Sequence, residues 1–375
     1  MSQSATRNPR LDGLQCLRCG RVYPLTLIHS PCSTCLQEGV HVGMRAHYAP
    51  AVAGGANAIP MPYLDGFTLG EGQTPLADSP ELARRMRLHR LSFKDETRNP
   101  TGSHKDRMSA MGVNQALDFG VHTLVLASSG NAAISAARYA QAAGLRCEVA
   151  TYSGISQVYA QALDEFGAQQ YSFDDNTGRW NFVADQANKP GYLALTNFQL
   201  PALGSTPLAV EGYKPIAQEC LEQGGLPDHV MVPTARGDLA WGIYAGFQAL
   251  LQAQQIDRLP RIWVVEPFAR LSHAQTEQDL GLSYPGQTDQ FSVAGATITY
   301  LQWQATRNTQ GGTIVVDDKA AYAARRLLGQ SAELCAAAAF GAIGPLQRSG
   351  QISAHDHVVV MLTASASRDP TWPGY

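Results

Sequence analysis

Long apolar runs, a large excess of either charge and the common hydrolase motifs are all missing from this chain of 375 residues. No apolar stretch approaches the ~20 residues that a membrane-spanning helix needs, and the first residues lack the apolar core of a secretory signal. Charged residues make up 16 % of the chain and its net charge is -3, so the composition offers no basic surface for nucleic acid. The sequence has no His-Glu-x-x-His pair, no Gly-x-Ser-x-Gly elbow and no Walker loop. It therefore predicts a cytoplasmic protein that binds neither a membrane nor nucleic acid.

Cysteine is present in an odd number, seven, which argues against a disulfide framework. Four cysteines cluster near the N-terminus as two Cys-x2-Cys pairs, namely Cys16, Cys19, Cys32 and Cys35. This spacing is typical of a zinc ribbon, in which four thiolates surround a structural Zn²⁺ and leave no position open for catalysis. We expect residues 1–45 to form this zinc-ribbon-like segment. The alternative is a ribbon whose reduced cysteines hold no metal.

Helical segments alternate with short apolar strands along the rest of the chain. Strands are expected at 122–127, 146–151, 170–173, 229–233, 262–266 and 357–362. The helices expected between and after them include 104–118, 132–143, 157–166, 212–223, 239–254, 319–328 and 332–349. Such alternation is typical of α/β proteins with parallel sheets. Its two series predict two open, mainly parallel sheets, which bind ligands at the carboxyl ends of their strands.

A charged run with a Pro-Thr-Gly-Ser turn, from Lys94 to Arg107, leads into the helix expected at 104–118. A lysine can attack a carbonyl group when its surroundings fix its position and lower its pKa. Lys105 stands directly after the turn, where the helix begins, and is the candidate nucleophile. The alternative is a surface lysine in a solvated charged patch.

Small and polar residues follow three of the expected strands. Ser128, Ser129, Gly130 and Asn131 stand at the start of a helix, where exposed N–H groups favour an anion; a simple helix cap is the alternative. The strand at 229–233 leads into Thr234, Ala235, Arg236, Gly237 and Asp238. A phosphate is usually held by successive N–H groups of a glycine-rich loop, and this loop has a single glycine. The strand at 357–362 ends at Thr363, with Ser365 close behind.

Together these motifs resemble the fold-type-II pyridoxal-phosphate enzymes of the tryptophan synthase β superfamily, and within it most closely the threonine synthase group. The resemblance covers about Leu69 to Pro370, and many members of the group carry a similar N-terminal ribbon. It implies two α/β domains with the cofactor in the cleft between them. The smaller domain is expected at 99–209, and the larger one combines 60–98 with 210–375. Relatives are usually homodimers.

The resemblance also implies the roles of the candidate residues. Lys105 forms an imine with the aldehyde of pyridoxal 5'-phosphate and later acts as the general base. The side chain of Asn131 contacts the hydroxyl oxygen of the cofactor ring, and the hydroxyl of Thr363 faces the pyridine nitrogen. The loop of Thr234, Ala235, Arg236, Gly237 and Asp238 holds the phosphate. The substrate, a small amino acid, contacts Lys94, Ser128, Ser129 and Gly130.

The reaction expected from this resemblance is elimination or replacement at Cβ or Cγ of an amino acid, with conversion of O-phosphohomoserine to threonine as one candidate. The alternatives are a serine/threonine dehydratase-like ammonia-lyase and a catalytically silent paralogue that acts as a binding protein. The threonine synthase pattern is incomplete here. Ala132 replaces a threonine, His104 a phenylalanine, and Thr206-Pro207-Leu208-Ala209 stands where relatives have Asn-Pro-x-Arg. An arginine would supply a bidentate contact to a substrate phosphate.

Overall fold

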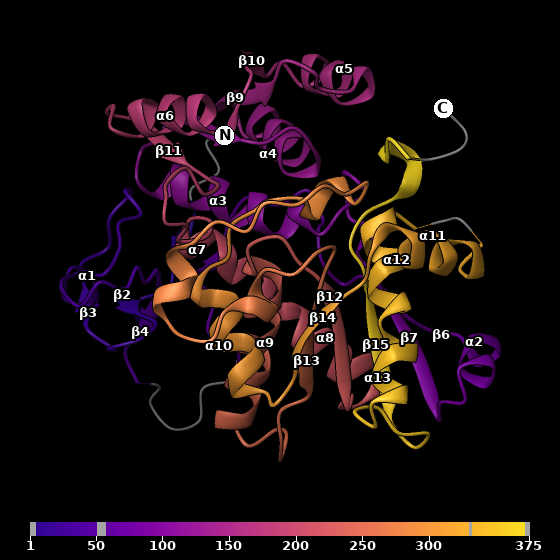
Figure 1. Cartoon of the computed structure of the whole chain (residues 1–375). Helices are drawn as coiled ribbons and strands as arrows, with labels where there is room; N and C mark the ends of the chain where they lie inside the picture. The colour runs from indigo at the N-terminus through magenta and orange to yellow at the C-terminus, as the bar shows by residue number, and fades with distance from the viewer. Residues whose placement is uncertain (1–4, 51–57, 330–331, 372–375) are drawn as a thin grey trace. The chain divides into compact units, whose positions relative to one another are not determined.

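The computed structural model describes residues 5–50, 58–329 and 332–371. Within them the chain forms two compact units (Figure 1). Unit 1 comprises the residues up to Glu71 together with Lys105–Tyr213, and unit 2 comprises Gly72–His104 and Lys214 onwards. The chain passes between the units at His104/Lys105, whereas the sequence analysis placed the corresponding boundary at 98/99. Part of the linker expected before residue 60 lies outside the described residues.

Unit 1 is built on a parallel sheet whose strand order, in the described residues, is β10-β9-β8-β11. Its strands are β8 (Thr123–Ala127), β9 (Arg146–Tyr152), β10 (Gln169–Phe173) and β11 (Tyr192–Ala194). The helices are α3 (Lys105–Asp118), α4 (Asn131–Ala142), α5 (Gln157–Glu165), α6 (Asn176–Ala187) and the short α7 (Pro207–Val210), followed by η2 (Glu211–Tyr213). Val183 of α6 packs on Val125, Ala150 and Ala194, so apolar side chains of three strands share one small core.

The N-terminal part of unit 1 is a separate antiparallel sheet of order β3-β2-β4. It consists of β2 (Leu11–Cys16), β3 (Val22–Tyr23) and β4 (Met44–Tyr48), with the short helix α1 (Ser33–Gln37) between β3 and β4. A further pair joins β1 (Thr6–Arg7) to β5 (Tyr63–Asp65).

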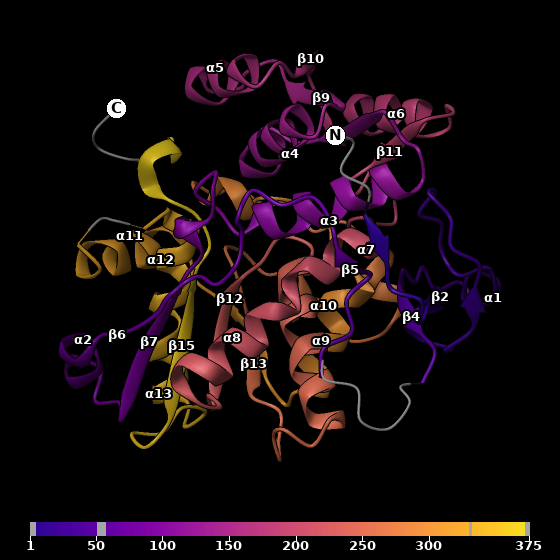
Figure 2. The same cartoon turned by 180° about the vertical axis from the view of Figure 1, so that it is seen from behind.

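Unit 2 contains, in the part of the chain described, a sheet of order β14-β13-β12-β15-β7-β6. Its neighbouring strands run parallel except at the edge, where β6 is antiparallel to β7. Figure 2 shows β6 and β7, in purple, beside the yellow β15 from the far end of the chain. The strands are β6 (Leu76–Asp78), β7 (Arg90–Asp95), β12 (His229–Pro233), β13 (Arg261–Glu266), β14 (Gly312–Val315) and β15 (His357–Leu362).

Alternate side chains of these strands point to opposite faces of the sheet. Leu91, Phe93, Met231, Val358 and Val360 belong to one buried core with α2 (Pro80–Arg85), α11 (Asp318–Leu327), α12 (Leu334–Gly341) and α13 (Ile343–Arg348). The intervening Val230, Val232 and Val359 are equally buried. Helix α9 (Asp238–Gln252) packs on α8 (Pro215–Gly224) and on α10 (Tyr300–Asn308), and both α9 and α10 contact β13. The short helices of unit 2 are η1 (Glu96–Arg98), η3 (Leu271–His273), η4 (Gln278–Gly281), η5 (Phe291–Val293) and η6 (Ala366–Arg368).

The α/β class and the parallel sheets agree with the sequence analysis. Two of the expected helices differ from it, and α2, α6 and α10 were not expected. The helix expected at 332–349 is two helices that meet at Ala342, because Pro345 lacks an N–H and its ring conflicts with the carbonyl four residues earlier. The helix expected at 212–223 begins at Pro215, a residue suited to the first turn. No helix among the described residues is long and apolar enough to cross a membrane.

Candidate functional site

Lys105 is the first residue of α3, and the structure fixes the start of this helix firmly. The next two residues, Asp106 and Arg107, are buried, and the hydroxyl of Ser135 donates to the Asp106 carboxylate at 2.6 Å. Lys94 and Glu96 are also buried. Four charged residues of the run are therefore buried, whereas Lys105 is half-buried and Arg98 is exposed.

An aromatic ring lies beside the lysine within unit 1. Nζ of Lys105 is 5.9 Å from the centre of the Tyr213 ring, a cation–π distance. Gly212 permits this placement, because a Cβ atom there would lie 2.2 Å from the carbonyl oxygen of Arg107 in α3. Tyr213 was not among the predicted site residues, although it follows the Glu211-Gly212 pair that marks this segment in the sequence.

The segment just before Lys105 is bound to the end of β15 within unit 2. The backbone N–H of His104 donates to the carbonyl of Thr363 at 2.9 Å, and its Nδ1 lies 3.0 Å from the same oxygen. Because a carbonyl only accepts, Nδ1 carries the proton. Ser365 N donates to Gly102 O at 3.0 Å. The residue that precedes the candidate nucleophile is therefore attached to the candidate cofactor residue Thr363, which is buried.

The turn between β8 and α4 places Ser128, Ser129, Gly130 and Asn131 together at the carboxyl end of a strand of unit 1. Gly130 is the N-cap of α4 and no side chain caps the helix. Ser128 Oγ accepts from Gly130 N at 3.3 Å, and Ser129 Oγ accepts from Tyr152 N at 3.0 Å. Within the described residues the half-buried side chain of Asn131 makes no hydrogen bond. The observed turn is thus not the simple side-chain cap considered above, and its amide remains available to a ligand.

Three carbonyl groups of the loop that follows β12 accept hydrogen bonds from side chains of other segments. Nη2 of Arg270 donates to Thr234 O at 2.8 Å, and Nε2 of Gln302 donates to Ala235 O at 3.2 Å. The hydroxyl of Thr299 donates to Arg236 O. Because C=O and N–H of one peptide plane point in opposite directions, holding successive carbonyls turns the following N–H groups the other way.

The same loop ends at the first turn of α9, whose N–H groups have no partner within the helix. Gly237 adopts a left-handed conformation, with φ 91°, and a Cβ atom there would lie 2.4 Å from Gln302 Cγ. The loop therefore needs glycine at one position only. Side chains of other segments bind the carbonyl groups of the remaining peptides.

Arg236, the cationic residue of this loop, contacts the segment of unit 2 that contains Gly295 and Thr297. Its Nε donates to the hydroxyl of Thr297 at 2.9 Å, and its guanidinium lies against Gly295. Asp238 is the first residue of α9. The loop residues named in the sequence analysis thus lie together at the carboxyl end of β12, and so does Thr363 at the end of the neighbouring β15.

Lys94, predicted to contact the substrate, occupies a different kind of environment. Its side chain is completely buried and its Nζ lies 2.6 Å from the carboxylate of Glu219, which is 2 % exposed. Nζ also donates to the carbonyl of Thr74. These partners satisfy the ammonium group inside unit 2.

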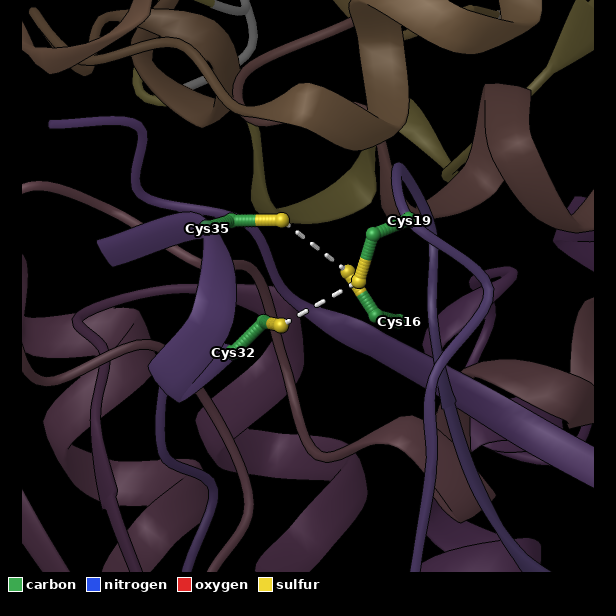
Figure 3. A group of neighbouring side chains, drawn as sticks. All are labelled: Cys16, Cys19, Cys32 and Cys35. Atoms are coloured by element: carbon green, nitrogen blue, oxygen red, sulfur yellow. Dashed lines mark hydrogen bonds between the residues drawn. The ribbon is translucent and has the colours of Figure 1, made fainter. Parts of the chain in front are cut away.

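The four N-terminal cysteines converge at one point (Figure 3). Their sulfur atoms all lie within 4.8 Å of one another, with 3.6 Å between Cys16 and Cys35 and 3.6 Å between Cys19 and Cys32. A tetrahedron of thiolates around Zn²⁺ has S···S separations of about 3.8 Å. The arrangement therefore suits one tetrahedral metal ion, and no disulfide is present among the described cysteines.

Neighbouring groups favour the thiolate at Cys32, whereas burial raises the pKa of Cys16 and of Cys35. Gly20, with φ 73°, allows the first knuckle to turn, and Arg18 N donates to Cys16 Sγ at 3.4 Å. Burial raises the pKa of Cys32, but the hydrogen bonds from the Tyr23 hydroxyl and from Cys35 N outweigh it and lower this pKa to about 6. Donors of this kind stabilise the metal-binding form of cysteine.

A cavity of about 650 Å³ lies at the amino ends of the strands of unit 2, opposite their carboxyl ends. His229, Arg261 and Asp356 are among its lining residues. Trp263 Nε1 donates to Nδ1 of His229 at 3.0 Å, so the proton of the neutral imidazole sits on Nε2 and is donated to Asp356. Burial lowers the pKa of His229. Because parallel strands present their active edge at their carboxyl ends, this cavity is not part of the candidate site.

Comparison with known proteins shows which family the chain belongs to. The family described as "Pyridoxal-phosphate dependent enzyme" matches residues 67–364. Threonine synthase from Synechocystis sp. is 29 % identical over 310 residues, which cover 81 % of this chain and 78 % of the relative. Threonine synthase from Methanosarcina acetivorans is 27 % identical over 383 aligned positions, covering 95 % and 92 %.

Two solved structures share the fold. A pyridoxal 5'-phosphate-dependent aspartate racemase superposes with a TM-score of 0.69 at 20 % identity, covering 81 % of this chain and 93 % of the other. An L-serine ammonia-lyase from Rhizomucor miehei gives a TM-score of 0.66 at 20 % identity, covering 78 % and 94 %. The α/β fold with parallel sheets is therefore that of known pyridoxal-phosphate enzymes. The chain belongs to the pyridoxal-phosphate dependent enzyme family and is a lyase that uses this cofactor.

Proposed function

We propose that this enzyme catalyses elimination or replacement at Cβ or Cγ of a small amino acid. The observation that carries the proposal is the loop Thr234–Asp238, whose carbonyls are held by Arg270, Gln302 and Thr299 while its N–H groups lead into the start of α9. Such a loop is suited to a phosphate monoester. The cofactor, when bound, supplies an aldehyde and a ring that accepts electrons.

Each candidate residue has a defined task in this proposal. Lys105 Nζ would hold the cofactor covalently, and its amine, when free, would take the α-proton of the substrate. The amide of Asn131 binds the ring hydroxyl oxygen. Thr363 presents a neutral hydroxyl to the ring nitrogen, which suits elimination and replacement better than transamination.

The turn at Ser128, Ser129 and Gly130 receives the substrate carboxylate in our proposal. It lies at the carboxyl end of β8 and at the N-terminus of α4, where the helix dipole favours an anion. Lys94, in contrast, is proposed to hold the fold rather than the substrate, because its ammonium already binds Glu219 and Thr74.

The substrate is less well defined than the reaction class. The threonine synthase relatives make O-phosphohomoserine one candidate. The segment Thr206–Ala209 supports a second candidate, a serine/threonine dehydratase-like ammonia-lyase. Here Leu208 and Ala209 are buried apolar residues, and Thr206 Oγ1 donates to Ala194 O, so this segment supplies no cation for a second phosphate.

Two measurements test the proposal. Reduction of the cofactor-loaded protein with sodium borohydride, followed by digestion and mass spectrometry, is expected to leave the cofactor on the peptide that contains Lys105. Modification of another lysine contradicts the assignment. A panel of serine, threonine, O-phosphohomoserine and O-acyl derivatives, assayed for ammonia, keto acid and phosphate, then separates the two substrate candidates.

We further propose that Cys16, Cys19, Cys32 and Cys35 hold a structural Zn²⁺, because the four thiolates occupy every position of a tetrahedron and leave none for a substrate. We also propose a cytoplasmic homodimer, because members of the family are usually homodimers. Its mass in solution, measured by light scattering at several concentrations, tests the oligomeric state.

A further inference from the structure

Arg270 is the largest side chain that is completely buried in the described structure. It lies at the start of η3, four residues after Glu266 at the end of β13. Nη2 donates to Thr234 O at 2.8 Å, and Nη1 donates to Val293 O at 3.0 Å and to Gly295 O. Nη1 also lies 3.5 Å from Ala235 O. The two Nη atoms of one guanidinium therefore reach carbonyls on two separate loops.

The charge of this buried guanidinium is balanced nearby. Glu266 is also 0 % exposed, and its carboxylate lies 3.5 Å from Arg270 Nε. The carboxylate in turn accepts from Arg270 N at 3.0 Å, from Leu271 N at 3.1 Å and from the hydroxyl of Ser272 at 2.8 Å. Burial lowers the pKa of Arg270 to about 10, the Glu266 charge opposing this effect, so the group is a cation at neutral pH.

Stability alone does not account for such a pair, since apolar residues of similar volume often stabilise a core equally well. The positions of the acceptors suggest a different role. Thr234 and Ala235 begin the loop Thr234–Asp238, which we call the anion loop. Gly295 lies against the guanidinium of Arg236, the cation of that loop. One buried side chain thus fixes both the peptides of the loop and the segment that holds its cationic side chain.

We propose that Arg270 is a positioning residue for the cofactor phosphate: by holding the carbonyls of Thr234 and Ala235 it aims the loop N–H groups at the phosphate. This inference rests on the proposed function, which assigns the phosphate to this loop. A lysine cannot replace the arginine fully, because its single nitrogen cannot span carbonyls on two loops as a planar fork does. The role is indirect, since Arg270 acts through the loop.

The test compares binding of pyridoxal 5'-phosphate with binding of pyridoxal, which lacks the phosphate, to the apo-protein by absorbance titration. Both aldehydes react with the same lysine. The dissociation constant of pyridoxal divided by that of pyridoxal 5'-phosphate therefore isolates the contribution of the phosphate. We expect Arg270→Met to reduce this ratio by about tenfold or more, the size expected for one hydrogen bond to a charged group. Arg270→Lys should give an intermediate ratio.

Arg325→Met is the matched control. Arg325 is likewise buried in unit 2, paired with Asp369 at 3.3 Å and bound to Thr371 O at 2.8 Å, and its partners lie outside the anion loop. This variant should lose stability yet keep the wild-type ratio. Melting temperatures of all apo-proteins report the general structural cost separately from the ratio.

Each outcome decides the question. A lower ratio in Arg270→Met with an unchanged ratio in Arg325→Met supports the positioning role. A wild-type ratio in folded Arg270→Met overturns it and leaves the proposed function intact. If Arg270→Met does not fold, a wild-type ratio in Arg270→Lys overturns it in the same way. If the wild-type protein itself binds both aldehydes equally well, the phosphate assignment of the loop fails, and the inference fails with it.

Discussion

Nζ of Lys94 lies 2.6 Å from the carboxylate of Glu219, and neither side chain is more than 2 % exposed. The pair belongs to a wider buried network. Glu219 also accepts from Gln73 N at 3.1 Å, and Thr74 donates to Glu96 at 2.7 Å. The network joins β7 and α8 to the chain that enters unit 2, and through Glu96 it extends to the segment that leads to Lys105.

The first prediction follows from this ion pair. Lys94→Met should lower the free energy of unfolding by about 3–5 kcal/mol, because it leaves the Glu219 carboxylate buried without its partner. Chemical denaturation measures the loss. Arg85→Met, which breaks the exposed pair with Glu81, is the control and should cost less than about 1 kcal/mol. A substrate-binding role would instead raise KM and leave stability unchanged, and that result would contradict our assignment.

The second prediction concerns pH. The Ser92 hydroxyl donates to Asp78 at 2.6 Å, so its oxygen accepts from Nε2–H of buried His357 at 2.8 Å. Burial lowers the pKa of His357 to about 4, and the Arg90 charge adds to this effect. The unfolded chain, with a histidine pKa of about 6.5, binds the proton first. The contribution of this histidine to stability is therefore fully present above pH ~6.5 and is lost progressively as the pH drops towards ~4.

His357→Gln keeps a donor for Ser92 and removes the titrating group. The wild-type protein should therefore lose more stability than the variant between pH ~6.5 and ~4, as measured by urea unfolding at each pH. His355→Gln alters an exposed neighbour, leaves His357 in place and should follow the wild-type curve. Parallel curves for wild type and His357→Gln would show that this imidazole is not responsible.

Gly237 provides the third prediction. Gly237→Ala places a side chain at φ 91° and brings Cβ to 2.4 Å from Gln302 Cγ and 2.8 Å from Gln302 N. The loop must shift, so we expect both a loss of stability above the 1–2 kcal/mol of the backbone strain alone and weaker cofactor binding. Gly120→Ala is the control, because Gly120 has φ 66° and open space around it. Equal effects of the two changes on cofactor binding would contradict the prediction.

The sequence predicted six strands of the two α/β sheets, and within the described residues it missed four, namely β6, β7, β11 and β14. β12 and β15 were placed at 229–233 and 357–362, as observed, because each is an unbroken apolar run typical of a buried parallel strand. β7 was missed because Arg90, Ser92 and Lys94 interrupt its pattern. Only the folded chain reveals that Glu219, more than a hundred residues away, neutralises Lys94 and allows this strand to be central.

The residues of the candidate site also fall into two groups, those in local turns and those that act on a distant segment. Residues on strand-to-helix turns, such as Asn131 and Gly237, could be proposed from the sequence because turn chemistry is local. Arg270 and Gln302 were missed because each acts on a loop more than thirty residues away and neither lies in a recognisable motif. Long-range support of a loop leaves no pattern in a single sequence.

The fourth prediction concerns the cysteine cluster. Because four sulfur atoms within 4.8 Å of one another suit a tetrahedral ion, the freshly purified protein should contain about one equivalent of zinc by elemental analysis. Cys19→Ser should lower both the zinc content and the melting temperature, since binding of the metal contributes to folding. Cys147→Ser removes a buried cysteine of β9, outside the cluster, and should leave the zinc content unchanged. Less than about half an equivalent in the wild-type protein would contradict the metal site. Reactivity of the four thiols towards a thiol reagent, low before chelation and high after it, provides a second measure of the same ion.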